Sequence, residues 1–255
     1  MGGATDCRSL DGRTAVVTGG HDGIGYYISQ ALAANGVRVA LLARRRERLE
    51  QAAAELGDNV VPIVCDVSDP DSVRRAFRAV DERVGTLDVL INNAAVFPIF
   101  RIGEATDEEL RTVVDTNLLG VLYCTRAAIE RMQRAGRGDI VTLSSESVLR
   151  PFPYLAAYAA TKAAVETLCR GLRNELRGTG IRVGVLRSGH VEVPGRDGSR
   201  WAPERAQAFF QAAEAGGYLA EAGPGIAPQA TARAVLHMLT QPDDAVVDVL
   251  ELRGC

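Results

Sequence analysis

The segment Thr14–Gly25 reads TAVVTGGHDGIG, and it decides the fold expected for the rest of the chain. Its first five residues form an apolar run typical of a buried strand, and a helix is predicted over residues 26–35. Glycines between a strand and a helix allow a tight turn and a close approach of the backbone to a pyrophosphate at the helix N-terminus. The segment therefore predicts nucleotide binding. Its candidate cofactor contacts are Gly19, His21, Asp22, Gly23, Ile24 and Gly25.

Strand and helix patterns alternate through the remaining sequence. Further strands are expected at 37–42, 60–64, 87–91, 139–144, 181–186 and 245–252, and helices at 45–56, 69–84, 106–135, 154–177 and 227–239. This alternation predicts one α/β domain over residues 13–255, with a doubly wound, mostly parallel seven-stranded sheet and helices on both faces. Residues 1–12 are expected to form a flexible lead. The least regular region, about 192–224, is interpreted as a lid over the ligand site.

Composition excludes several classes of function. The chain is 47% apolar and 24% charged with a net charge of −3, which gives no sign of a nucleic-acid or membrane partner. No run of eighteen apolar residues is present, so no membrane span is predicted. The five cysteines are scattered without metal spacing, which favours a reducing, cytoplasmic setting and no metal cofactor.

Three residues in the middle of the chain suggest proton-transfer chemistry. Tyr158 and Lys162 are four residues apart, which places both on one face of a helix. A nearby ammonium favours the phenolate, so Lys162 is expected to lower the pKa of Tyr158 toward neutrality. Ser145 ends the preceding strand, where its hydroxyl can hold the same substrate oxygen.

A serine followed by Tyr-x-x-x-Lys, together with the glycine turn, resembles the short-chain dehydrogenase/reductase family. The resemblance implies a Rossmann domain in which Tyr158 gives a proton to a carbonyl oxygen and Ser145 orients that oxygen. It implies that Lys162 holds the nicotinamide ribose. It also implies that Asn117, in the segment DTNLLG, supports a proton-relay water bound to the lysine.

The end of the second strand favours NADP(H) over NAD(H). Ala43 takes the position of the acidic residue that would bind the ribose 2′-hydroxyl of NAD, and Arg44 follows with a guanidinium suited to a 2′-phosphate. The alternative is that Arg44 merely begins a solvated helix, and Asp22 pulls toward NAD. The resemblance adds Asp66, Val67, Asn93, Gly189 and Val191 to the cofactor contacts, with Tyr158 and Lys162.

The resemblance is weakest after the sixth strand. Ser188 and Val193 stand where relatives usually carry proline and a threonine that holds the nicotinamide carboxamide. His190 or Glu192 are candidates to replace that threonine.

Aromatic residues are concentrated in three loops at the carboxyl ends of strands, where ligands bind in open parallel sheets. They are Phe97, Phe100, Phe152, Tyr154, Trp201, Phe209, Phe210 and Tyr218. Apolar walls predict a bulky, largely hydrophobic ketone; the alternative is that these rings only close the domain. Arginines in the same loops, Arg101, Arg150, Arg196 and Arg200, leave a carboxylate or phosphate open.

The sequence thus predicts an NADP(H)-dependent carbonyl reductase. Two alternatives stay open: an epimerase that oxidises its substrate transiently with a retained cofactor, and a non-catalytic nucleotide-binding regulator. Apolar residues on more than one face of the helices at 106–135 and 154–177 predict a homodimer or homotetramer.

Overall fold

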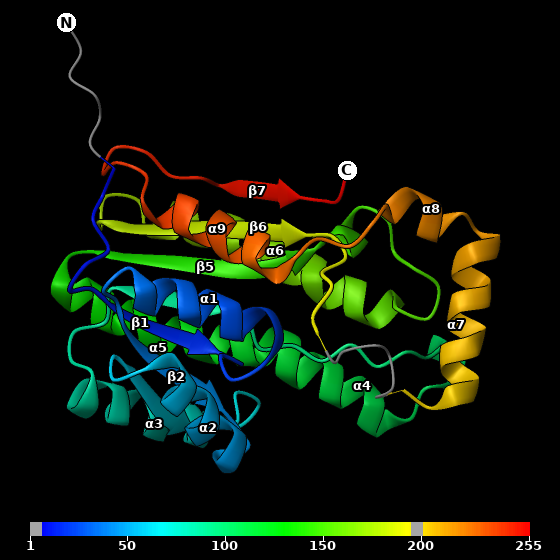
Figure 1. Ribbon diagram of the computed structural model, residues 1–255, viewed down its shortest axis with the longest axis horizontal. Coiled ribbons are helices and arrows are strands. Elements are labelled where there is room, and N and C mark those ends of the chain that lie inside the picture. Colours follow the sequence, from blue (N-terminus) through cyan, green and yellow to red (C-terminus); the bar gives the residue numbers. More distant parts are fainter. Residues whose placement is uncertain (1–6, 195–200) are drawn as a thin grey trace, which may run out of the picture.

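A seven-stranded parallel sheet forms the centre of the protein (Figure 1), as the computed structural model of residues 7–194 and 201–255 shows. The strands are β1 (Thr14–Thr18), β2 (Arg38–Ala43), β3 (Val60–Val64), β4 (Val89–Asn92), β5 (Gly138–Ser145), β6 (Ile181–Ser188) and β7 (Val249–Leu252). Their order is β3-β2-β1-β4-β5-β6-β7, and every neighbouring pair is parallel. The predicted doubly wound α/β sheet is confirmed.

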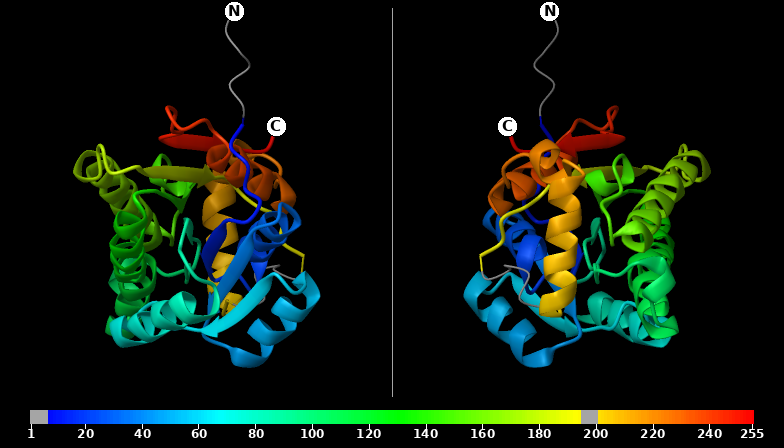
Figure 2. Two further views of the ribbon diagram at one scale, coloured as in Figure 1. Left: turned by 90° about the vertical axis from the view of Figure 1, so that its left-hand side faces the viewer. Right: turned by 90° about the vertical axis from the view of Figure 1, so that its right-hand side faces the viewer.

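Helices cover both faces of the sheet (Figure 2), and each face buries its own hydrophobic core. One face carries α1 (Gly23–Ala34), α2 (Arg46–Leu56) and α9 (Pro228–Leu239); the other carries α3 (Pro70–Arg83), α5 (Gly120–Ala135) and α6 (Ala156–Glu175). Fully buried Ile28 of α1 belongs to the first core, and fully buried Phe77 of α3 belongs to the second. These buried faces fix the helices on the sheet and leave its carboxyl edge for loops.

The predicted helix at 106–135 forms, but with an interruption. Thr106 and Glu109 make the reciprocal hydrogen bonds of a capping box, so α4 begins directly after the cap and spans Asp107–Val114. A π-helical turn, η2 (Asp115–Leu119), then joins α4 to α5. Such turns are rare and often lie at functional sites, and this one contains Asn117.

Three predicted elements differ from the structure. Tyr154 has φ of 64°, which a right-handed helix excludes, so α6 begins at Ala156 rather than at 154. The region expected to be irregular contains two helices, α7 (Pro203–Ala215) and α8 (Tyr218–Ala222). The last strand, β7, is shorter than expected. The short 3-10 segments η1 (Ile102–Glu104) and η3 (Glu146–Val148) complete the loops at the carboxyl edge.

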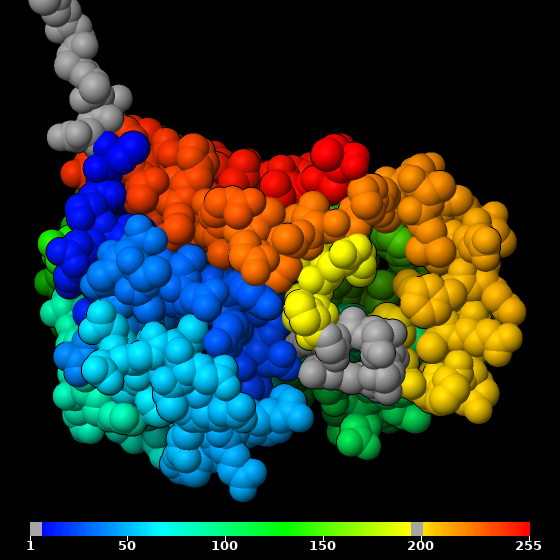
Figure 3. All heavy atoms as spheres, in the orientation of Figure 1, coloured from blue at the N-terminus to red at the C-terminus, as the bar shows by residue number. Residues whose placement is uncertain are grey.

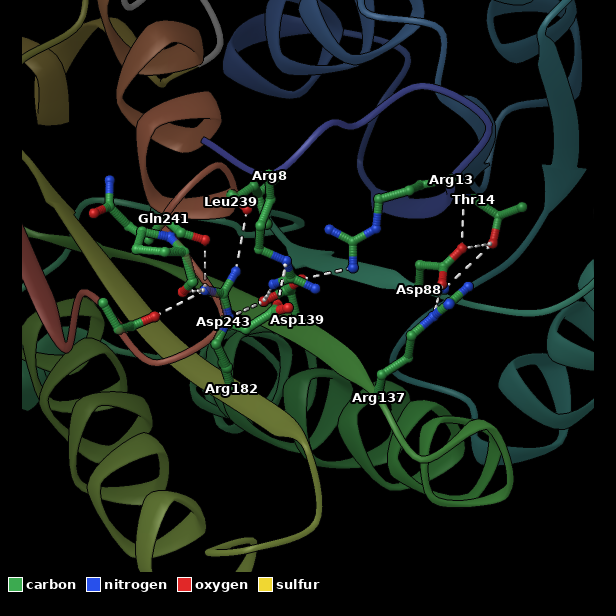
Figure 4. A network of polar contacts seen from close by, with 12 residues as sticks. Arg8, Arg13, Thr14, Asp88, Arg137, Asp139, Arg182, Leu239, Gln241 and Asp243 are labelled. Atoms are coloured by element: carbon green, nitrogen blue, oxygen red, sulfur yellow. Dashed lines mark hydrogen bonds and ion pairs between the residues drawn. The ribbon is translucent and has the colours of Figure 1, made fainter. Parts of the chain in front are cut away.

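A network of buried ion pairs lies at the amino ends of the strands (Figure 4). Asp139 of β5 pairs with Arg8, Arg13 and Arg182 at nitrogen–oxygen distances of 3.3, 2.8 and 2.6 Å. Leu10 is also buried. Arg8 and Leu10 therefore pack on the domain, which differs from the flexible lead expected over residues 1–12. Its first six residues lie outside the described part of the chain.

Across the described residues, no helix has the length and apolar character needed to cross a membrane.

Candidate active site

The glycine turn lies between β1 and β4, where the strand order of the sheet reverses. A side chain at Gly25 would place its Cβ 2.4 Å from the Gly19 carbonyl oxygen, so only glycine permits this close approach. Gly19 itself has φ of 66°, the left-handed region that glycine adopts without strain. Asn93 donates from Nδ2 to the Thr18 carbonyl at 2.9 Å. Asn93, a predicted cofactor contact, thus also holds the glycine turn against the end of β4.

The N-terminus of α1 follows the glycine turn at this point of the sheet, where ligands bind in open α/β folds, and its first turn holds no acidic residue. Gly23 and Ile24 open the helix, and Asp22 precedes it. The Asp22 carboxylate lies 4.0 Å from Arg45, whose guanidinium also lies 3.3 Å from His21 Nε2. The negative charge of Asp22 is the sequence feature that favours NAD over NADP. The Arg45 guanidinium lies close enough to offset that charge.

Arg44 extends from the end of β2 with 64% of its side chain exposed. One guanidinium nitrogen lies 3.9 Å from Asp66 Oδ2, a long contact. Asp66 Oδ1 accepts hydrogen bonds from the Ser68 N–H at 3.0 Å and from the Ser68 hydroxyl at 2.6 Å. Val67 is buried beside Gly120, where an added Cβ would lie 2.8 Å from Val67 Cγ2. Arg44 is thus free to reach a ligand phosphate, whereas Val67 packs against α5 at Gly120.

Ser145, Tyr158 and Lys162 come together at the carboxyl end of β5. Ser145 is its last residue and hydrogen-bonds to the Tyr158 phenol. Lys162 Nζ lies 5.7 Å from the centroid of the Tyr158 ring. The ammonium donates to the Leu143 carbonyl at 2.7 Å, two residues before Ser145. The spacing in the sequence thus places a phenol, a hydroxyl and an ammonium side by side.

The predicted direction of the Tyr158 pKa shift is wrong in this structure. Burial raises the pKa of Tyr158 to about 12, the nearby Glu146 carboxylate adds to the rise, and the hydrogen bond with Ser145 opposes it. Burial also lowers the pKa of Lys162 to about 8. The Lys162 ammonium donates to the Leu143 carbonyl, and the loss of water around the phenol decides the direction of the Tyr158 shift.

Asn117 is buried in η2 and ties the helix to the loop after β4. Its Oδ1 accepts from the Val96 N–H at 2.8 Å, and its Nδ2 donates to the Val96 carbonyl at 2.8 Å. Nδ2 also lies 3.3 Å from Thr161 Oγ1, one residue before Lys162. The side chain is therefore used to hold the loop and α6 together, and its backbone lies in the π-helical turn.

The segment after β6 is held by backbone pairing with Ile226. The Glu192 N–H donates to the Ile226 carbonyl, and the Ile226 N–H donates to the His190 carbonyl, each at 2.9 Å. Val191 forms the bridge between these bonds, and its carbonyl accepts from the Val193 N–H at 3.1 Å. The His190 and Glu192 side chains lie against Gly225, where an added Cβ would come within 2.7 Å of both. At Gly189, an added Cβ would lie 3.2 Å from Glu146 Oε2.

A chain of aromatic rings runs from Tyr158 to residues of α7. The Phe97 ring lies edge-on to Tyr158 and to Trp201, with centroid distances of 6.1 and 5.8 Å. Trp201 continues to Phe209 at 5.5 Å and to Phe210 at 6.4 Å, and its Nε1 donates to the Phe97 carbonyl at 3.2 Å. Figure 3 shows the surface hollowed between α7–α8, in orange, and the yellow segment after β6. The rings thus form a continuous series of contacts from Tyr158 through Phe97 and Trp201 to Phe209 and Phe210.

Two of the predicted aromatic residues lie apart from this chain of rings. Phe100 is buried, and its N–H donates to the Tyr154 carbonyl at 3.0 Å, so it is a core residue. The Tyr154 ring lies under Arg101, with 5.1 Å from the guanidinium carbon to the ring centroid.

Arg150 is engaged by residues 216–221 rather than presented to a ligand. Its guanidinium stacks 4.3 Å from the centroid of Tyr218, donates to the Gly216 carbonyl at 3.2 Å and pairs with Glu221. The remaining arginine candidates, residues 196 and 200, and part of the predicted lid (195–200) lie outside the described residues.

Sequence patterns missed three charged residues beside the site. Glu146 directly follows Ser145, and burial raises the pKa of its carboxyl. Glu166 of α6 and Arg187 of β6 form an ion pair at 2.7 Å. The sequence did contain one signal for the Glu166–Arg187 pair. Glu166 is an acidic residue four positions after Lys162, on a helix face that is otherwise buried.

A groove of about 580 Å³ lies at the opposite, amino end of the sheet, between Arg8, Arg173 and Arg182. Each of these arginines pairs with an aspartate. The groove is therefore remote from the residues that carry chemistry.

The family described as short chain dehydrogenase matches residues 13–202 of this sequence. The chain belongs to the short-chain dehydrogenase/reductase family. Among curated relatives of this family, it is 35% identical over 196 residues to a short-chain type dehydrogenase/reductase of Picea abies, covering 71% of this chain and 72% of that protein. An oxidoreductase of Sarocladium schorii, asL5, is 36% identical over 179 residues, covering 70% and 72%.

Solved short-chain dehydrogenase structures superimpose over almost the whole chain. A variant of the actinorhodin polyketide ketoreductase, crystallised with NADPH, matches with a TM-score of 0.85 and 31% identity, covering 96% of this chain and 97% of that one. An alcohol dehydrogenase from the archaeon Thermococcus sibiricus, in complex with 5-hydroxy-NADP, matches with a TM-score of 0.79 and 32% identity, covering 94% and 96%. The protein is therefore an oxidoreductase of this family, and several of its structural neighbours carry NADP-type cofactors.

Proposed function

We propose that this protein is an NADP(H)-dependent carbonyl reductase that converts a bulky, largely hydrophobic ketone to an alcohol. The observation that carries the proposal is the grouping of Ser145, Tyr158 and Lys162 at the edge of the sheet, beside the Phe97 ring. A phenol, a hydroxyl and an ammonium within one site can hold and protonate a carbonyl oxygen.

The residues around the glycine turn and the end of β2 fit an NADP-type cofactor. The N-terminus of α1 offers backbone N–H groups and a favourable dipole to a pyrophosphate, with no acid in its first turn. Arg44 presents an exposed guanidinium at the end of β2, where a 2′-phosphate would need a cation. Lys162 uses one bond to Leu143, and its ammonium has further donors for ribose hydroxyls. A bound nicotinamide would supply the hydride.

The protein's own part in the reaction is to hold the substrate oxygen and give it a proton. With its pKa raised to about 12, Tyr158 is protonated at neutral pH, as a proton donor must be. Ser145 hydrogen-bonds to the phenol and is placed to hold the same oxygen. Asn117 keeps the loop after β4 and the helix of Lys162 in register, and its π-helical turn is where we place a proton-relay water.

The aromatic chain supports a hydrophobic substrate. Phe97 and Trp201 lie between Tyr158 and the outer rings of the lid, so a ketone bound at Tyr158 would contact their faces or edges. Arg150 is already occupied by Tyr218 and Glu221, which argues against a carboxylate anchor at that position. The substrate surface is therefore expected to be mostly apolar.

We further propose a cytoplasmic homodimer or homotetramer. Val114 of α4 and Leu122 of α5 are 41% and 37% exposed, on the helices expected to pair across a two-fold axis. Light scattering at micromolar concentration should give the mass of a dimer or tetramer, and a monomer would contradict this part of the proposal.

The proposed activity is tested with a panel of aromatic, aliphatic and carboxylated ketones, each with NADPH and with NADH, followed at the nicotinamide absorbance. Faster turnover of bulky hydrophobic ketones with NADPH is expected. Absence of net turnover, with nucleotide still bound after purification, would instead point to an enzyme that retains its cofactor.

A further inference from the structure

A buried ion pair lies one helical turn beyond Lys162. Glu166 of α6 is 9% exposed, and the Arg187 side chain on β6 is 14% exposed. Arg187 Nε donates to Glu166 Oε1 at 3.0 Å, and Nη2 donates to Oε2 at 2.7 Å. This two-pronged geometry is the strongest that a guanidinium and a carboxylate form.

The Glu166 carboxylate has both of its oxygens engaged. Oε1 also accepts from the Ser144 hydroxyl at 2.6 Å, next to Ser145. Burial alone would raise the pKa of Glu166, but the hydrogen bonds from Arg187 and Ser144 and the charge of Arg187 outweigh it and hold that pKa below its ordinary value. Glu166 is therefore a buried carboxylate that stays charged at neutral pH.

Lys162 stands four residues before Glu166, a spacing at which oppositely charged side chains on a helix can pair. It does not pair with Glu166 here. Its ammonium donates to Leu143, and its pKa is lowered by burial without an offsetting carboxylate. The arrangement around Glu166 accounts for this, because Arg187 and Ser144 already occupy the carboxylate.

We propose that Arg187 is a positioning residue that occupies Glu166 and thereby leaves the Lys162 ammonium free to face Tyr158 and the cofactor ribose. The inference rests on the role given to Lys162 in the proposed function. Without the guanidinium, an unpaired carboxylate would attract a cation from its own helix. Arg170, four residues after Glu166, already acts on it through its charge, and Lys162, four residues before it, is the candidate that lies at the reacting groups.

Arg187 is itself held by the edge strand. Its Nη1 donates to Glu251 Oε2 of β7 at 3.0 Å, and Glu251 pairs in turn with Arg253 at 3.3 Å. The guanidinium therefore bridges β6, β7 and α6, and its orientation toward Glu166 is fixed from the side away from the site.

The test compares Arg187→Met, the double variant Arg187→Met/Glu166→Gln, and Arg173→Met as a matched control. Like Arg187, Arg173 links α6 to β6 and to the segment before β7. It lies on α6 itself, at the end far from the site, and donates to the carbonyls of Val183 and Asp248. The dissociation constant for NADPH is measured by fluorescence titration, together with Tm and kcat for the best ketone.

Arg187→Met should raise the Kd for NADPH about tenfold, which corresponds to about 1.4 kcal/mol. The double variant should recover most of that loss, because the glutamine has no charge to attract Lys162. Arg173→Met should lower Tm and leave the Kd unchanged. If Arg187→Met does not fold, Arg187→Gln replaces it. Glutamine can still donate to Glu166 but carries no charge, so the Kd for NADPH should rise less than tenfold and should recover in Arg187→Gln/Glu166→Gln.

An unchanged Kd in a folded Arg187→Met protein would overturn the inference, as would a double variant that binds as weakly as the single one. If the Kd for NADPH changes only in parallel with Tm in all three proteins, the role of Arg187 is structural and not one of positioning Lys162. Wild-type protein that binds NADPH but reduces no ketone would refute the proposed activity, while the Kd comparison still decides the role of Arg187. Wild-type protein that binds no nicotinamide nucleotide would overturn both.

Discussion

Lys162 and Tyr158 lie on one face of α6, with the ammonium nitrogen 5.7 Å from the centroid of the phenol ring. Burial shifts their pKa values in opposite directions, to about 8 for the lysine and about 12 for the tyrosine. At neutral pH the lysine is therefore charged and the tyrosine carries its proton. This pairing of states suits the donation of a proton to a substrate oxygen, the direction in which a reductase works.

The buried lysine should leave a mark on the pH dependence of stability. Its pKa is 10.5 in the unfolded chain and about 8 when folded, so between pH 8 and 10 the unfolded state binds more protons. The free energy of unfolding of the wild type should then rise with pH relative to that of Lys162→Met, by about 1–3 kcal/mol in total. Below pH 8 this contribution is lost.

The measurement is urea unfolding of both proteins from pH 7 to 10. Buried cysteines, such as Cys65 with its pKa raised to about 12, titrate alike in both proteins and cancel in the difference. Tyr158 affects the pH dependence of the free energy of unfolding only above pH 10. Its pKa is raised on folding, so the stability that it contributes stays constant below that pH. A difference that stays flat over this range would show that Lys162 is not desolvated as described.

Cofactor choice should depend on Arg44. Arg44→Ala removes the exposed guanidinium at the end of β2 and should weaken NADPH binding about tenfold or more, since charge-assisted hydrogen bonds contribute about 1.5–3 kcal/mol. NADH, which lacks the extra phosphate, should bind nearly as before. Arg46→Ala is the control, because Arg46 is equally exposed but pairs with Glu50 on the outside of α2. Equal losses for both nucleotides would show that Arg44 does not read the 2′-phosphate.

Substrate ranking should depend on Trp201 more than on Phe209. Trp201 contacts Phe97, which contacts Tyr158, so Trp201→Ala should reorder the ketone panel with little change in Tm. Phe209 is 7% exposed among Phe152, Trp201 and Phe210, and Phe209→Ala should lower Tm as a buried aromatic truncation does. Phe210, 46% exposed, provides the control. A Trp201→Ala protein with lower Tm and an unchanged ranking would end the assignment of this ring to the substrate wall.

Residue spacing predicted the sheet, the glycine turn and the grouping of Ser145, Tyr158 and Lys162. These depend on local periodicity and on the rule that parallel strands present their carboxyl ends at one edge. The sign of the Tyr158 shift was not predictable in this way. It depends on how much water the surrounding side chains exclude, which spacing does not express.

Other features depend on contacts between distant segments. Phe100 lies three residues after Phe97 and looks equivalent in sequence, yet one ring is buried in the core and the other is 43% exposed beside Tyr158. The Glu166–Arg187 pair joins α6 to β6 across twenty-one positions of chain, and neither residue belongs to the motif that identified the site. Only the folded structure brings such pairs together.

The central claim is that Tyr158 gives the proton during ketone reduction, and Tyr158→Phe tests it most directly. The variant keeps the ring and its edge-on contact with Phe97 but removes the hydroxyl. Single-turnover reduction of the best ketone by bound NADPH should slow by at least ~10²-fold, with Tm and the Kd for NADPH unchanged, because only the acid is missing. A Tyr158→Phe protein that reduces the ketone at the wild-type rate would contradict the account.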